Sequence, residues 1–401
     1  MNVLFLTLLN FESLQERTIY TDLLREFVKN GHNVYAVSPV EKRLNQKTHL
    51  IEEKNAKILR LQIGNTQKTN LIEKGISTVK IEPTFKRGIK KYFSSVKFDL
   101  ILYSTPPITL VSAIKYIKRR DNAKTYLLLK DIFPQNAVDI GMLSKSGIRG
   151  LLYRHFRKQE KKLYAISDRI GCMSQANVEY VVKHNPEIEK VKVEVCPNSI
   201  EVIDKSVDEI TRNNIREKYE IPLDKTVFIY GGNLGKPQGI PFLIECLKRC
   251  SNILDVFFLV VGDGTEYGKL EKYIITSGQK NVKLMKRLPK EDYDTMVGAC
   301  DVGMIFLDHR FTIPNFPSRL LAYMQAKLPV LAVTDRNTDI GEVIVKNGFG
   351  WWCESNDSKG FHELVLTIVK ESNIKTMGEN SYRLLEDRYS TSQGYEIINR
   401  I

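Results

Sequence analysis

The chain has 401 residues, of which 42% are hydrophobic and 27% are charged, and this composition is typical of a globular protein. A chain of this length is usually too long to fold around a single hydrophobic core, so two domains are expected. The net charge is +13, yet residues 1–200 alone carry an excess of 15 positive charges, so the second half is slightly acidic. The first half is therefore expected to face an anionic partner.

Strand and helix patterns alternate through residues 1–200, which predicts a parallel sheet covered on both faces. The apolar amino terminus lacks the basic leader and cleavage site of a signal peptide and is interpreted as the first strand. The predicted strands are Asn2–Leu8, Asn33–Val37, Lys57–Gln62, Asp99–Tyr103, Thr125–Leu129, Ile170–Met173 and Lys192–Cys196. The predicted helices include Leu14–Lys29, Ile108–Arg119 and Ile148–Tyr164.

Residues 201–222 are charged and carry no strand pattern, so they are interpreted as a linker with a short helix. A second α/β domain is predicted for residues 223–385. Its expected strands are Thr226–Tyr230, Asp255–Val261, Val282–Lys286, Val302–Phe306, Val330–Val333 and Gly348–Trp352, and its helices include Ile240–Cys250 and Glu266–Thr276. The tail, residues 386–401, is expected to include a helix packing back across the domains. Ligands of such folds bind beyond the carboxyl ends of the strands, so an interdomain cleft is the expected site.

The stretch Asp308–Pro329 contains the strongest candidate for a phosphate site. Pro314 and Pro317 stiffen a loop that leads to Ser318, an expected N-cap for a helix over Arg319–Lys327. Helix N-termini attract anions, and the guanidinium of Arg319 suits phosphate oxygens. Pro317, Ser318 and Arg319 are therefore candidate diphosphate ligands. An ordinary capped connection with a solvated arginine is the equally weighted alternative.

The second domain opens with a strand that runs into the glycine-rich turn GGNLGKPQG, residues 231–239. Gly232 allows a ligand to approach the backbone closely, and Lys236 offers a mobile positive charge. The spacing fits neither a Walker loop nor a strict dinucleotide fingerprint, and many such turns are glycine-rich for steric reasons alone.

Two further strand ends carry candidate ligand-binding residues. Asp263, in the turn Val260-Val-Gly-Asp-Gly264, either binds a polar group or, as the favoured alternative, caps the next helix. Arg287 and Leu288 follow another strand and either hold a base edge or form a plain strand-to-helix turn.

In the first domain, Lys130 and Asp131 end a buried strand, which is where catalytic residues belong in such sheets. Asp131 is therefore a candidate to accept a hydrogen bond or a proton from a bound substrate. A helix cap or a salt bridge is the alternative role for this carboxylate.

Basic residues alternate with aromatic ones in residues 85–93 and again in residues 149–158. This composition favours helices on anionic lipid, although a solvated face over a core is the alternative for either segment alone. The positive charge of the first half tips the interpretation towards membrane contact or acceptor binding, and the assigned residues are Lys86, Arg87, Lys90 and Lys91. No nucleic-acid-binding motif accompanies this charge.

The order of the motifs resembles a known family. The glycine-rich turn, then VGDG, then KRLPKEDYDTMVGACDVGM and FPSRLLAYMQAKLPVLA are similar to the carboxyl-terminal domain of retaining family-4 glycosyltransferases. The first half is consistent with this resemblance in its GHNV strand, in Ser104-Thr-Pro-Pro107 and in Cys196-Pro-Asn-Ser199. The branch it resembles most comprises capsule and O-antigen transferases that use acetamido-sugar nucleotides, such as N-acetylfucosamine transferases.

The resemblance implies the GT-B architecture, with two facing Rossmann-like domains, and a nucleotide-sugar donor, UDP-sugar being the expected one. It matches Ser318 and Arg319 to the diphosphate-binding loop and Asp131 to a polar residue beside the reacting sugar. The arginine and lysine of the family's glycine-rich turn are replaced by Asn233 and Gln238. The family's paired glutamates fall on two other residue types, Pro314 and Ala322.

The sequence thus predicts a retaining, metal-independent glycosyltransferase without a cofactor, acting on a polyprenyl-diphosphate-linked acceptor. It is expected in the cytoplasm, peripherally on the inner face of the cell membrane. The six cysteines, without zinc-binding spacing, are consistent with reduced thiols in that compartment. Two rivals are a sugar-nucleotide epimerase of the same architecture and a non-catalytic partner subunit of a glycosyltransferase.

Overall fold

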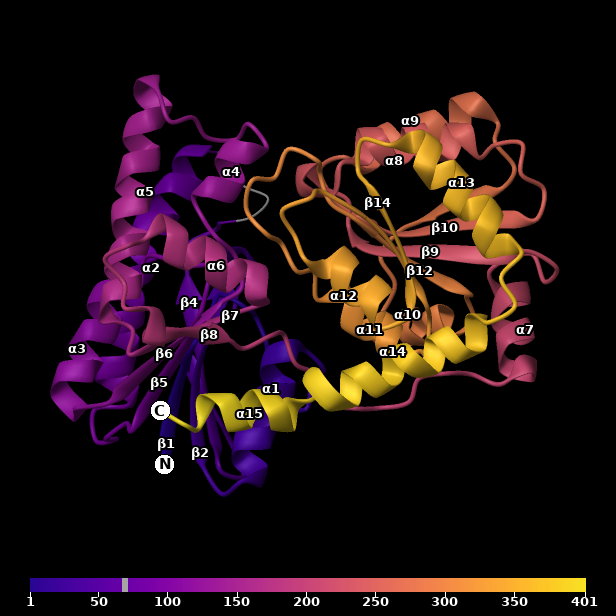
Figure 1. Ribbon diagram of the computed structural model, residues 1–401. Helices are drawn as coiled ribbons and strands as arrows, with labels where there is room; N and C mark the ends of the chain where they lie inside the picture. The colour runs from indigo at the N-terminus through magenta and orange to yellow at the C-terminus, as the bar shows by residue number, and fades with distance from the viewer. Residues whose placement is uncertain (67–70) are drawn as a thin grey trace. The chain divides into compact units, whose positions relative to one another are not determined.

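The computed structural model describes residues 1–66 and 71–401, which divide into two compact units (Figure 1). Unit 1 comprises Met1–Glu201 together with Thr391–Ile401, and unit 2 comprises Val202–Ser390. Both units are α/β structures built on a largely parallel sheet, which confirms the predicted fold class. No helix in the described ranges has the length and apolar character needed to cross a membrane.

The sheet of unit 1 has the strand order β3-β4-β2-β1-β5-β6-β7-β8, and only the β3–β4 pair is antiparallel. Its strands are β1 (Asn2–Leu6), β2 (Asn33–Glu41), β3 (His49–Glu53), β4 (Ala56–Ile63), β5 (Leu100–Ser104), β6 (Lys124–Leu129), β7 (Arg169–Cys172) and β8 (Val193–Val195). Its helices are α1 (Ile19–Lys29), α2 (Leu71–Tyr92), α3 (Val111–Asp121), α4 (Gln135–Asp139), α5 (Gly147–Ile166), α6 (Gln175–His184) and α15 (Thr391–Ile398). The sequence pattern did not predict the short strand β3.

Helix α1 begins at Ile19, five residues later than the pattern predicted. Thr18 and Thr21 form a reciprocal capping box, which satisfies the first backbone donors and fixes the helix start. The carboxyl-terminal helix α15 packs on α1, where the Tyr395 ring meets Phe27 edge-on with centroids 5.0 Å apart. The Tyr395 hydroxyl lies 2.9 Å from His32 Nε2. These contacts make the end of the chain part of the unit that contains its beginning.

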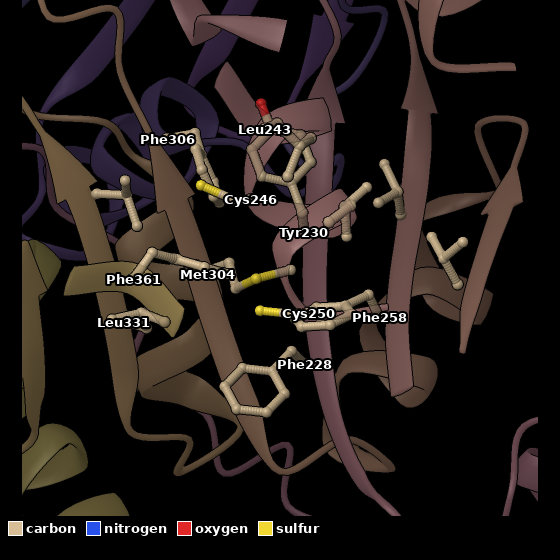
Figure 2. Close-up of a cluster of buried hydrophobic side chains, with 14 of the residues drawn as sticks. Phe228, Tyr230, Leu243, Cys246, Cys250, Phe258, Met304, Phe306, Leu331 and Phe361 are labelled. Atoms are coloured by element: carbon tan, nitrogen blue, oxygen red, sulfur yellow. The ribbon is translucent and has the colours of Figure 1, made fainter. Parts of the chain in front are cut away.

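The sheet of unit 2 is parallel throughout, in the order β11-β10-β9-β12-β13-β14. Its strands are β9 (Thr226–Asn233), β10 (Val256–Asp263), β11 (Val282–Met285), β12 (Val302–Phe306), β13 (Val330–Thr334) and β14 (Gly350–Glu354). Its helices are α7 (Glu209–Lys218), α8 (Ile240–Arg249), α9 (Tyr267–Ser277), α10 (Lys290–Gly298), α11 (Arg319–Gln325), α12 (Ile340–Lys346), α13 (Ser358–Val369) and α14 (Ile374–Arg388). One face of this sheet packs in an aromatic and sulfur-rich core around Phe228, Phe258 and Met304 (Figure 2).

Most of the segment interpreted as a linker belongs to unit 2. Arg216 of α7 is completely buried and pairs with Asp301 at 2.7 Å. Its other guanidinium nitrogens donate to the carbonyl oxygens of Ala299, Pro222 and Lys225. The short helix predicted in residues 201–222 is thus α7, and a buried, fully paired arginine fixes it to unit 2. All six cysteines are buried and free of disulfide bonds.

Candidate active site

In unit 2 the strand order reverses at β9. Strands β10 and β11 lie on one side of it, and β12, β13 and β14 lie on the other. In open parallel sheets, ligands bind beyond the carboxyl ends of the strands at such a switch point. Here β9 ends in Gly231, Gly232 and Asn233, and the helix that follows β12 begins at Arg319.

The backbone at the end of β9 lies against side chains from α10 and α11. A Cβ on Gly231 would lie only 1.6 Å from the Tyr293 hydroxyl, so only glycine fits at this position. The Gly231 amide points at the Tyr323 hydroxyl, 3.3 Å away. Gly232 has φ +121°, a conformation that L side chains rarely adopt, and a Cβ there would lie 3.6 Å from Arg319 Nη2.

No acidic side chain that the structure describes pairs with the guanidinium of Arg319. Its Cζ atom lies 4.4 Å from the centroid of the Tyr230 ring, a cation–π contact. Its Nη1 atom is buried and forms no hydrogen bond. Among the ion pairs of the described residues, none involves Arg319. We call Arg319, Tyr230, Gly231 and Gly232 the arginine socket.

The tyrosines around this guanidinium stay neutral. Burial raises the pKa of Tyr323 to about 12, and it also raises the pKa values of Tyr230 and Tyr293. Three neutral phenols leave the charge of Arg319 uncompensated. The socket therefore has the electrostatics of an anion site.

Ser318 occupies the N-cap position of α11, but its side chain caps nothing. Its backbone is already helical, at φ −65° and ψ −15°, so the hydroxyl is not directed at the first amides as it would be in an extended cap. The expected capping role is wrong. The serine is exposed and Pro317 is half-buried, beside the first residue of the helix. The helix itself ends at Gln325, two residues earlier than predicted.

The glycine-rich turn holds its own shape through Gln238. Its Oε1 atom accepts hydrogen bonds from Asn233 Nδ2 at 3.1 Å and from the Gly235 amide at 3.2 Å. The Pro237 carbonyl accepts the amide of Asp308, which follows β12, at 2.9 Å. Lys236 is exposed at the tip of the turn. The turn is thus tied to the loop that leads to Arg319.

The other candidate donor-binding residues follow neighbouring strands. Asp263 is exposed and stands in register with Asn233 across the β9–β10 pair. Its Oδ1 accepts the Gly264 amide at 2.8 Å, so it caps the turn and not the following helix. Arg287 is exposed and Leu288 is half-buried after β11. The parallel strands place all these residues at one edge of the sheet.

Unit 1 has a switch point of its own between β1 and β5, and Asp131 follows the next strand, β6. The Thr105 hydroxyl accepts the amides of Lys130 and Asp131, at 3.0 and 3.2 Å. Asn136 Nδ2 donates to Asp131 Oδ1 at 2.6 Å. Burial raises the pKa of this carboxyl to about 6, against the opposing effect of the Asn136 hydrogen bond. Such a group takes up and releases protons close to neutral pH.

The side chain of Lys130 has other partners. Its Nζ atom lies 3.5 Å from the Pro197 carbonyl oxygen, and burial lowers its pKa to about 8. The described residues contain no ion pair between Lys130 and Asp131, so the salt bridge considered from the sequence is not formed there. The acidic Asp131 and the basic Lys130 thus have different partners, and the pKa of each side chain is moved towards neutrality.

The basic–aromatic segment in residues 85–93 forms the end of helix α2 and the residue that follows it, Phe93. Its apolar residues Phe85, Ile89 and Phe93 are buried in unit 1 and cannot contact lipid. The interpretation as an amphipathic lipid-binding helix is therefore wrong in its apolar half. Arg87, Lys90 and Lys91 remain exposed, and Lys86 is half-buried. Lys86 and Lys90 lie over the Tyr116 ring of α3, at 5.3 and 4.5 Å.

Across the described ranges, no group of three or more His, Cys, Asp or Glu side chains is arranged to hold a metal ion. Asp335, at the end of β13, accepts the amides of Asn337 and Thr338. Burial raises its pKa to about 6.

Residues 211–384 match the family model described as Glycosyl transferases group 1. This part of the chain, most of unit 2, is therefore similar to the domain that defines that family. The probable glycosyltransferase WbjE of Pseudomonas aeruginosa is 26% identical over 337 residues, which are 81% of this chain and 79% of that protein.

Solved structures show the same fold over the whole chain. Sucrose-phosphate synthase from Thermosynechococcus elongatus has a TM-score of 0.77 at 14% identity, covering 100% of this chain and 98% of that one. HepE of Anabaena in complex with UDP-glucose has a TM-score of 0.69 at 15% identity, again covering 100% and 98%. The fold is that of GT-B glycosyltransferases, as the motif order predicted.

In unit 2, the site residues that the sequence did not single out are the tyrosines around Arg319. Tyr323 follows the arginine by four positions on one helix, a spacing that places two side chains on the same face. That signal was available in the sequence. Tyr230 and Tyr293 reach the arginine only through the packing of β9 and α10, which no local pattern reveals. In unit 1, Thr105 and Asn136 were missed for the same reason.

Proposed function

We propose that this chain is a retaining, metal-independent glycosyltransferase that uses a nucleotide diphosphate sugar, with UDP as the nucleotide and an N-acetylated amino sugar as the transferred group. The acceptor is a lipid-linked saccharide in the synthesis of a bacterial capsule or O-antigen polysaccharide. The glycosyltransferase family match and the fold shared with a UDP-glucose complex support the donor class. The motif resemblance supports the acceptor and the sugar.

The observation that carries this proposal is the uncompensated guanidinium of Arg319. Cleavage of the bond between the sugar and the diphosphate leaves growing negative charge on the leaving group. An arginine held in place before the reaction stabilises that charge without reorganisation, and it does so more strongly in the transition state than in the ground state. Gly232 has no Cβ, so a phosphate oxygen can approach both the guanidinium and the backbone.

The remaining residues at this edge of unit 2 have subsidiary roles in the proposal. Lys236 reaches the phosphates from the exposed tip of the turn, while Asn233 and Gln238 fix the shape of the turn. Asp263 and the segment Arg287–Leu288 contact the nucleoside. In unit 1, Asp131 accepts a hydrogen bond or proton from the acceptor hydroxyl, and Lys130 contributes positive charge beside it.

Replacing Arg319 with alanine tests the socket directly. Loss of a charge-assisted phosphate contact of about 1.5–3 kcal/mol weakens UDP binding by at least about tenfold. Calorimetric titration with UDP measures the affinity. Arg319→Lys keeps the charge but not the planar donors, so its affinity is expected to lie between those of the wild type and Arg319→Ala. Arg336→Ala is the matched control, because Arg336 is exposed in the same unit and pairs with Glu354. Equal affinities in Arg319→Ala and the control would refute the socket.

A thermal-shift screen against UDP-, GDP- and dTDP-sugars identifies the donor, because a ligand that binds only the folded state raises the melting temperature. Transfer to a polyprenyl-diphosphate-linked sugar, with the anomeric configuration read by NMR, tests the acceptor and the retention. Conversion of the UDP-sugar without any acceptor would instead favour an epimerase. Donor binding without turnover until a second protein is added would favour a partner subunit.

A further inference from the structure

The first half of α5 and the loop before it expose apolar side chains that no described residue covers. Ile148 is 87% exposed, Leu151 62% and Leu152 46%, and Met142 in the preceding loop is 57% exposed. Helical spacing places Ile148, Leu151 and Leu152 on one face. By contrast, Ile210 and Leu254 are exposed to a similar degree but have no other exposed large apolar residue near them in the described sequence.

Cations border this face and acidic residues are absent from the segment. From residue 140 to residue 159 the sequence contains five lysines and arginines and no aspartate or glutamate. Arg149 lies on one side of the apolar face, and Arg154 and Lys158 lie on the other, by the 100° rotation per residue. These three side chains are exposed and form no ion pair with a described residue. Arg157, by contrast, points inward and pairs with Glu160 at 2.6 Å.

We propose that this face, residues 142–158, docks unit 1 onto an anionic lipid bilayer. Exposed leucine and isoleucine flanked by basic residues are the composition of helices that lie in the interface between headgroups and acyl chains. A second copy of this chain fits less well, because a two-fold contact would place the same unpaired cations against each other. The basic border favours a negative surface over a neutral one.

The same segment packs close to Asp131, the residue proposed to bind the acceptor. The Phe156 ring of α5 contacts Phe133 edge-on with centroids 5.0 Å apart. Phe133 follows Asp131 by two residues, and Asn136 of α4 binds that carboxylate. Helix α5 therefore packs on the segment that leads from Asp131 to α4, and Figure 1 shows α4 and α5 in the same unit. Delivery of a lipid-linked acceptor to this residue is the one part of the inference that rests on the proposed function.

Flotation with vesicles tests the docking face on the full-length protein. The triple variant Ile148→Ser, Leu151→Ser, Leu152→Ser is expected to lower partition onto vesicles of phosphatidylethanolamine and phosphatidylglycerol by about a hundredfold. A matched triple of equally exposed residues in unit 2, Ile210→Ser, Leu254→Ser and Ile275→Ser, is expected to leave it unchanged. Wild-type binding should fall with added salt and be weak on phosphatidylcholine alone.

A second pair of variants separates this face from the basic surface of α2. Arg149→Gln with Arg154→Gln should weaken binding to the anionic vesicles, whereas Lys90→Gln with Lys91→Gln should change it little. Loss of binding in the α2 pair alone would overturn the proposal, as would no vesicle binding by the wild type. A dimer in sedimentation velocity that the α5 triple abolishes would assign the face to a second copy. UDP binding is expected to be unchanged in all these variants, so a loss of vesicle binding can be distinguished from a failure of the proposed donor site.

Discussion

The replacement Asp131→Asn has a predicted effect on stability that changes with pH. Asp131 is half-buried just after β6, and the desolvation of its carboxyl raises the pKa from 3.8 to about 6. This difference between the two pKa values corresponds to about 3 kcal/mol of preference for the protonated carboxyl in the folded state. Asparagine has the same shape, retains an oxygen that accepts the Asn136 hydrogen bond, and never carries the charge.

The sign follows from the folded and unfolded pKa values. Below pH 3.8 the carboxyl is protonated in both states, so the wild type has the full stability of a neutral group at this position. As the pH rises through 6, the folded protein must accommodate a buried charge, and that stability is lost. Asp131→Asn should therefore gain about 2–3 kcal/mol relative to the wild type between pH 4 and pH 8.

Hydrogen exchange of unit 1 peptides, read by mass spectrometry across denaturant, is the appropriate assay. Both tryptophans, Trp351 and Trp352, lie in unit 2, so their fluorescence reports on the other unit and provides an internal reference. Asp224→Asn, at an exposed carboxylate of unit 2, is the control substitution. A difference between Asp131→Asn and the wild type that is the same at pH 4 and pH 8 would refute the reasoning.

Three further substitutions test the packing around the sites. Gly232→Ala forces an L side chain into φ +121° beside the guanidinium of the socket, so it should cost about 1–3 kcal/mol of stability by thermal unfolding and weaken UDP binding. Gly231→Ala places a methyl group on the Tyr293 hydroxyl and should destabilise unit 2 by about 1–3 kcal/mol in tryptophan-monitored urea unfolding. Arg216→Ala removes the donors to three carbonyl oxygens and one of the two arginine partners of Asp301, so it should cost about 3 kcal/mol in the same assay.

The sequence was sufficient for those features that local patterns encode. Alternating apolar strands and helices predicted both sheets, and the glycine-rich turn and Arg319 were each recognised as candidates for one site. Their adjacency comes from the order of the strands, because β12 lies directly beside β9. Parallel pairing then places the end of one strand next to the helix that follows the other.

Patterns failed where tertiary packing decides which face of a helix is buried. The segments at residues 85–93 and 149–158 have the same basic and aromatic composition. Phe85 of α2 and Phe93, which follows α2, are buried in unit 1, whereas Leu151 of α5 is exposed to solvent. Composition alone cannot distinguish these outcomes, because both helices are amphipathic. Helix α7, predicted as a short helix within the charged linker, is a related case, because its charged residues include the buried Arg216.

Arg319 differs from the two fully buried arginines of the described residues in how its guanidinium is satisfied. Arg216 donates from all three guanidinium nitrogens, to Asp301 and to backbone carbonyls. Arg60 donates from both terminal nitrogens, among others to Phe11 and Ser38, and its Nε alone lacks a partner. The fold thus supplies most of the acceptors that these two arginines need, because a buried donor without one costs about 1–3 kcal/mol. Arg319 has Nη1 unsatisfied beside neutral tyrosines, and an anion with two oxygens is the partner that would satisfy it.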